Sequence, residues 1–101
     1  MQSNLLIGNV VADPVLNTSK ETPYTKLRIA VNSRKETLFV DIFYSGKTAE
    51  QICQHLTKGR LVSVTFNIKN NKYTKDGVEV HTFDFYGNDC VFLDRKENEN
   101  D

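Results

Sequence analysis

The sequence has few cysteines, and their placement excludes disulfide-rich and zinc-binding classes of protein. Cys53 and Cys90 have no partner at the spacing of a metal site or a redox motif. Two thiols are also too few to cross-link a small secreted scaffold. We expect both to be buried, reduced thiols, and we predict no metal and no cofactor.

Long apolar runs are absent as well. No segment approaches the roughly 20 apolar residues that a membrane-spanning helix needs, and no basic segment followed by a long apolar run opens the chain. We therefore expect a cytoplasmic protein without membrane contact. A length of 101 residues predicts one domain with a modest core.

The sequence also lacks the motifs of common enzymes. It contains no H-E-x-x-H, no phosphate loop, no dinucleotide-binding glycine pattern and no nucleophile elbow. Asp41 and Asp84 are single carboxylates in predicted strands, and nothing in the sequence pairs them as an acid and a base. We expect a protein that is not an enzyme.

Net charge is absent too, because 13 basic residues balance 13 acidic ones. This balance argues against a strongly cationic nucleic-acid binder. The distribution is uneven, however, since no acidic residue lies between Glu50 and Asp76. Such a stretch fits a solvated face as well as a nucleic-acid surface. Its cations are Lys58, Arg60, Lys69, Lys72 and Lys75.

The chain shows five strand-like segments and one helix. Ala49, Ile52, Cys53 and Leu56 form one apolar stripe, which predicts a helix over 47–57. Asp76-Gly77 predicts the turn of a hairpin. Alternation and β-branched content predict strands over 5–11, 26–32, 37–45, 61–68 and 78–86, with a short closing segment over 90–93.

This order is that of the OB-fold, an all-β, five-stranded Greek-key barrel with one helix between strands three and four. An antiparallel α+β sandwich is the alternative. We assign residues 1–93 to the barrel. Residues 94–101 are polar without an apolar anchor, which predicts a short disordered tail.

The third predicted strand has one apolar side and one unusual side. Alternation places Val40, Ile42 and Tyr44 toward the core, and Phe39 and Phe43 on the opposite side with Asp41 and Ser45. Exposed rings of this kind form a platform for nucleic-acid bases, worth about 1–3 kcal/mol per base in proteins that bind single strands. The alternatives are that the rings are buried under the hairpin or a partner chain, or that a slip of one residue exchanges Phe43 with Tyr44.

The predicted hairpin combines cations with an aromatic ring. Lys69, Lys72 and Lys75 surround Tyr73, which would join backbone neutralisation to base stacking. Asn71 could add a hydrogen bond to a phosphate or a base edge. The alternative for Tyr73 is an ordinary cross-strand pair.

Several fragments in a fixed order resemble one known family. They are Asn4-Leu5-Leu6-Ile7-Gly8-Asn9-Val10 with Asp13-Pro14, Gly46-Lys47-Thr48-Ala49-Glu50 followed by Leu56-Thr57-Lys58-Gly59, and Lys72-Tyr73 with Asp76-Gly77. Over residues 4–93 the chain resembles the bacterial-type single-stranded DNA-binding protein family. The resemblance implies sequence-tolerant binding of single-stranded DNA in replication, recombination, repair, or phage or mobile-element replication. It also implies a homo-oligomer, a tetramer before a dimer, and replication proteins as partners.

Carried over by position, the resemblance makes Phe39 and Tyr73 stacking residues and places Lys47, Lys58, Lys69 and Lys72 along the DNA path. Ser45 stands where the family has a second stacking aromatic, and no linker or acidic hydrophobic tip follows the barrel. These departures predict a compact member of the family that binds more weakly or over a shorter site. The full set of candidate nucleic-acid-binding residues is Phe39, Phe43, Tyr73, Lys26, Arg28, Arg34, Lys35, Lys47, Lys58, Lys69, Asn71, Lys72 and Lys75.

A second hypothesis has a different basis. Zero net charge, Asp41 on the presumed binding face and the missing aromatic at Ser45 are also compatible with an OB-fold interaction module for a replication partner, with little affinity for DNA. Binding of RNA is a nearer variant.

Overall fold

Five strands and one helix follow one another along the chain in the predicted order. The structure, a computed structural model, describes residues 1–94. The elements are β1 (Asn4–Val10), β2 (Tyr24–Asn32), β3 (Thr37–Ser45), α1 (Gly46–His55), β4 (Leu61–Lys75) and β5 (Val78–Phe92).

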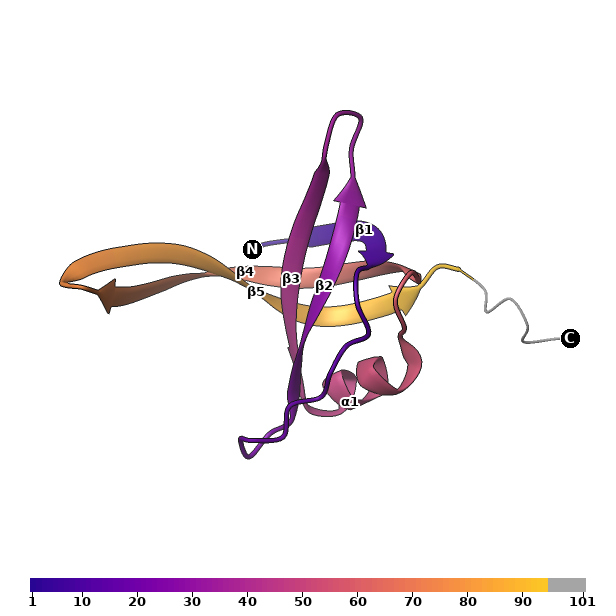
Figure 1. The fold of residues 1–101 in the computed structure, drawn as a ribbon, viewed down its shortest axis with the longest axis horizontal. Coiled ribbons are helices and arrows are strands. Elements are labelled where there is room, and N and C mark those ends of the chain that lie inside the picture. Colours follow the sequence, from indigo (N-terminus) through magenta and orange to yellow (C-terminus); the bar gives the residue numbers. More distant parts are fainter. Residues whose placement is uncertain (95–101) are drawn as a thin grey trace, which may run out of the picture.

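The strands close into a barrel in the order β1-β2-β3-β5-β4, and β1 pairs antiparallel with β4 to complete it. β3 and β5 run parallel and pair at Phe43 and Tyr86. In Figure 1, α1 lies at the end of the barrel opposite the tip of the β2–β3 hairpin, and the β4–β5 hairpin extends to the left as a long arm. The predicted OB-fold is confirmed. The sandwich alternative is wrong, because the sheet closes on itself.

Alternate residues of the strands fill the barrel, and the helix covers one end of it. On β3, Val40, Ile42 and Tyr44 are buried as predicted, which leaves Phe43 on the outer side and excludes the register slip. The core consists of Val10, Leu27, Ile29, Val40, Ile42, Tyr44, Ala49, Ile52, Leu56, Val62, Val64 and Phe66.

Tyr44 is the one large polar side chain of this core. Its hydroxyl donates a hydrogen bond to the carbonyl oxygen of Asp89 over 2.8 Å, and burial raises the pKa of Tyr44, so the phenol stays neutral. The ring lies against the backbone at Gly87, where any Cβ would clash with it. A register shift at Thr65/Phe66 on β4 lies opposite this point, so β5 approaches Tyr44 where the ladder is irregular.

β4 and β5 are longer than the sequence predicted. Each runs for 15 residues, so the polar segment that was expected to link 61–68 to 78–86 is itself paired strand, and 90–93 forms the end of β5. The predicted turn is confirmed: Asp76 and Gly77 have φ of 52° and 76°, as a two-residue hairpin turn requires. Polar composition concealed these strands because their side chains face solvent on both sides of the arm.

The two cysteines are partly buried, rather than buried as predicted. Both are free. Burial raises the pKa of the Cys90 thiol to about 11, which keeps it protonated at neutral pH and makes it a weak nucleophile. Among the described residues, no helix has the length and apolar content needed to cross a membrane.

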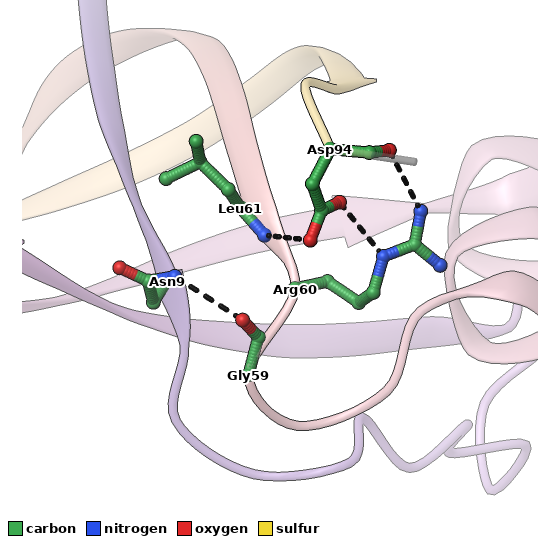
Figure 2. A network of polar contacts seen from close by, with 5 residues as sticks. All are labelled: Asn9, Gly59, Arg60, Leu61 and Asp94. Atoms are coloured by element: carbon green, nitrogen blue, oxygen red, sulfur yellow. Dashed lines mark hydrogen bonds and ion pairs between the residues drawn. The ribbon is translucent and has the colours of Figure 1, made fainter. Parts of the chain in front are cut away.

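An ion pair fastens the end of the described chain to the start of β4. The Arg60 Nε donates to the Asp94 carboxylate over 2.8 Å, and the Leu61 backbone N–H donates to the other oxygen over 3.2 Å (Figure 2). Arg60 also lies over the ring of Phe92, with its Cζ 5.0 Å from the centroid. Asp94 therefore belongs with the barrel, although the sequence placed it in the tail. The rest of that tail, 95–101, lies outside the described residues.

This ion pair predicts a pH-dependent stability. The hydrogen bonds from Arg60 and Leu61 lower the pKa of Asp94 below its ordinary value of 3.8. The contribution of the Asp94 carboxylate to the free energy of unfolding is therefore complete above about pH 3.8. It is lost as the pH falls through the lower pKa that Asp94 has in the folded state. Asp94→Asn should lower the melting temperature at pH 7, and the gap to the wild type should narrow below pH 3.8 in thermal denaturation followed by circular dichroism. The control is Asp76→Asn in the exposed turn, and a gap that stays constant across the pH range contradicts the assignment.

Candidate nucleic-acid interface

The outer face of the β2–β3 hairpin carries four of the predicted site residues. The strand register places Lys26 opposite Phe43, Arg28 opposite Asp41 and Ala30 opposite Phe39. Paired residues of neighbouring strands share a face, so these side chains all lie on the outside of the barrel. The Phe39 ring is 52% exposed and that of Phe43 is partly buried. The structure thus brings Phe39, Phe43, Lys26 and Arg28 together.

Three rings form a continuous row across β2, β3 and β5. Tyr24 meets Phe43 edge to face, with centroids 5.2 Å apart. Phe43 meets Tyr86, with centroids 6.0 Å apart and the ring planes tilted by 59°. We call Tyr24, Phe43 and Tyr86 the aromatic row. These neighbours explain why Phe43 is only partly exposed: each ring supports the next and leaves part of its surface open to solvent.

Two members of the aromatic row were missed by the sequence reasoning. Tyr24 lies at the start of β2, in a segment with Pro23 that was expected to be a connection. Tyr86 lies in a predicted strand, but only the parallel pairing of β3 with β5 places it beside Phe43. Alternation along β5 offered a signal that Tyr86 points outward, because it puts Tyr86 and Gly87 on opposite faces of the strand.

Cations lie against the rings of this face. Lys20 Nζ is 5.6 Å from the Tyr24 centroid, and Lys69 Nζ is 5.0 Å from the Tyr86 centroid. Arg28 lies over Phe39 with its Cζ 5.4 Å from the centroid, and its Nε is 3.8 Å from Asp41 Oδ1. Such contacts hold positive charge beside an aromatic surface. Positive charge and ring surface side by side suit a ligand that alternates phosphates and bases.

The β4–β5 arm separates the hairpin residues that the sequence grouped together. Lys69, Asn71 and Tyr73 are paired with Asp84, Thr82 and Val80, on the same side of the ribbon as Tyr86, and Lys75 continues this alternation. Tyr73 is 47% exposed.

Lys72 lies on the opposite side of the arm. Its cross-strand partner is His81, and its Nζ is 3.6 Å from the Glu79 carboxylate. The expectation that Lys72 surrounds Tyr73 together with Lys69 and Lys75 is therefore wrong, because the strand period of two sends even and odd positions to different sides.

The remaining predicted cations lie at the ends of the barrel. Arg34 and Lys35 are exposed at the tip of the β2–β3 hairpin, whereas Lys47 is in α1 and Lys58 follows it, at the other end (Figure 1). The Lys58 backbone N–H donates to Asp13 Oδ1 over 2.7 Å. Arg34 and Lys35 lie away from the aromatic row, at the hairpin tip, whereas Lys47 follows Ser45, the register partner of Tyr24, by two residues.

A cleft of about 450 Å³ opens where β3 and β5 diverge from their pairing at Phe43 and Tyr86. β3 and β5 supply rings and two carboxylates, and Lys26 of β2 lines the cleft as well. The lining residues are Lys26, Phe39, Val40, Asp41, Phe43, Phe83, Asp84, Phe85 and Tyr86. This volume is within the range of small-molecule sites.

A profile of the Single-strand binding protein family matches residues 1–93. The chain belongs to this family. It is 33% identical over 100 residues to the single-stranded DNA-binding protein of Clostridium perfringens, an alignment that covers 93% of this chain and 67% of that protein. It is 34% identical over 85 residues to single-stranded DNA-binding protein 1 of Streptococcus pyogenes, covering 76% and 64%. The chain thus spans about two thirds of the length of these relatives.

The fold has a solved counterpart in the mitochondrial single-stranded DNA-binding protein of Saccharomyces cerevisiae, with a TM-score of 0.80 at 22% identity over 94% of this chain and 97% of that one. The family comprises DNA-binding proteins that are not enzymes, which confirms the predicted non-enzymatic class. Within residues 1–94, no three potential metal ligands gather into a group.

Proposed function

We propose that this protein binds single-stranded DNA with little regard to base order, by stacking bases on the aromatic row and neutralising phosphates with the cations beside it. The observation that carries the proposal is the row Tyr24, Phe43 and Tyr86, with Lys20 and Lys69 over its outer rings. Bases of a duplex are already stacked on one another, so such a row favours a single strand. Membership of the family supports the same function.

The proposed strand crosses β2, β3 and β5 and continues along one side of the arm. Phe39 and Tyr73, each about half exposed, lie beyond the row on β3 and on the arm. Arg28, Lys26 and Asn71 supply charge and hydrogen bonds along this path. We further propose that the protein acts in the cytoplasm where single strands are exposed, during replication, recombination or repair of cellular, phage or mobile-element DNA, with replication proteins as partners.

Removing rings from the row should weaken binding. In fluorescence polarisation with a labelled oligo-dT, Phe43→Ala and Tyr86→Ala should each raise the Kd by about 5-fold or more, which corresponds to the ~1–3 kcal/mol of a stacked base. Phe92→Ala is the matched control, because its ring lies against Arg60 away from the row.

In the same titrations, Lys69→Ala should lower the salt slope of log K by about 0.7, and Lys72→Ala, on the other side of the arm, should change it less.

Equal affinity of the wild type for duplex and oligo-dT, or ring variants that bind like the Phe92→Ala control, contradicts the stacking mechanism. Absence of DNA binding at low salt together with one stoichiometric protein partner in a pull-down supports the interaction-module alternative.

We also propose that the protein is a homo-oligomer, a tetramer before a dimer, joined through the outer face of β1, β4 and β5. Leu5 and Ile7 on β1 and Val91 on β5 are 58%, 49% and 54% exposed, and the register aligns Ile7, Ser63 and Val91 across the sheet. β1 pairs with β2 only at Asn9 and Val10, so within the described chain residues 4–8 leave one strand edge open. An apolar face beside an open edge suits a second copy of the chain. This face lies outside the aromatic row.

Charge on the apolar face should dissociate the oligomer. Light scattering after size exclusion should give the wild type a multiple of the 11.5 kDa chain mass, four times in the favoured case. Ile7→Lys should shift the mass toward that of one chain with an unchanged circular dichroism spectrum. Val15→Lys, at a loop position that is 78% exposed, is the control. A wild type that runs as a monomer at micromolar concentration contradicts this proposal.

A further inference from the structure

We propose that the cleft between β3 and β5 receives one nucleobase edge-on and that Asp84 makes it prefer cytosine over uracil or thymine. This inference rests on the proposed function, because it assigns a base-selective position to the same single-strand path. The cleft opens directly beside the Phe43–Tyr86 contact, so a strand that stacks on the aromatic row passes its mouth.

The walls of the cleft suit a flat ring. Phe39 and Phe43 come from β3, and Phe83 and Tyr86 from β5, so aromatic residues flank the opening on both strands. Phe83 is 69% exposed and has no role in the core, although Phe85 two residues later packs against Phe66 with centroids 5.3 Å apart. A base inserted here would cover part of Phe39, one of the most exposed rings of the described chain.

The polar groups of the cleft decide which base edge fits. Lys26, Asp41 and Asp84 line it; the lysine ammonium donates hydrogen bonds, whereas a carboxylate only accepts them. Cytosine presents the N4 amino group as a donor, whereas uracil and thymine present the O4 acceptor at the same position. A carboxylate facing that position therefore binds cytosine and repels the other two pyrimidines.

Asp84 is the principal determinant because the two carboxylates differ in their partners. Asp41 lies 3.8 Å from the Arg28 guanidinium, and its side chain is 44% exposed. Asp84 is partly buried, and among residues 1–94 no side chain forms a hydrogen bond or an ion pair with its carboxylate. Its cross-strand neighbour Lys69 lies over the Tyr86 ring instead. The acceptor oxygens of Asp84 are thus available to a ligand.

The test compares oligo-dC with oligo-dU of equal length, since these two bases differ in size very little and lack the thymine methyl group. Polarisation at fixed salt should give the wild type an affinity for oligo-dC about 5-fold or more above that for oligo-dU. Asp84→Asn should bring this ratio close to one, because the amide offers a donor to O4. The ratio is the readout, since loss of a negative charge strengthens binding to every oligonucleotide. Glu79→Gln, which removes one charge from the opposite side of the arm, should leave the ratio unchanged.

The outcomes separate this inference from the proposed function. Salt-sensitive binding of both oligonucleotides with equal affinity overturns the base-selective cleft and leaves the single-strand function standing. A cytosine preference that survives in Asp84→Asn also overturns it, because Asp84 then does not cause the preference. No binding of either oligonucleotide overturns the function and the inference together. If Asp84→Asn does not fold, Asp84→Ser, which also removes the carboxylate, replaces it in the comparison and should likewise bring the ratio close to one.

Discussion

The packing of Tyr44 against Gly87 is the contact on which the outer face of the barrel depends. The buried phenol, held by its hydrogen bond to Asp89, occupies the space that a side chain at position 87 would need. Strand alternation then fixes the neighbours: Phe43 must point outward from β3 and Tyr86 outward from β5. Alternation along β3 thus buries the Tyr44 ring inside the barrel. Alternation along both strands sets the rings of Phe43 and Tyr86 against each other on its surface.

The closed barrel presents faces that differ in charged, aromatic and aliphatic side chains, although the chain as a whole has no net charge. The aromatic row gathers residues from β2, β3 and β5, with lysines over its outer rings. On the far side of the arm, the Lys72 ammonium lies 3.6 Å from the Glu79 carboxylate. The outer face of β1, β4 and β5 carries exposed aliphatic side chains instead. Local charge and local ring surface, rather than the total charge, therefore determine what each face can bind.

The sequence predicts the elements of this fold well because their signals are local. The apolar stripe of α1, the Asp76-Gly77 turn and the alternation that separates Phe43 from Tyr44 all act within a few residues. The aromatic row needed non-local information: Tyr86 reaches Phe43 only through the parallel β3–β5 pairing, and Tyr24 lies in what composition indicated was a connection. The sequence does not predict strands along the arm, because both sides of the arm face solvent and carry polar residues. The side of the arm on which Lys72 lies could be assigned only once the arm was known to be paired strand.

Mapping the contact surface by NMR tests the central claim most directly. Amide chemical shifts of the isotope-labelled protein would be followed while an oligo-dT is titrated in. We expect the largest shifts on the outer positions of β2, β3 and β5 around Tyr24, Phe43 and Tyr86, and little change at the amides around Leu5 and Ile7. The largest shifts on the apolar face of β1, or on the Lys72 and His81 side of the arm, would contradict it.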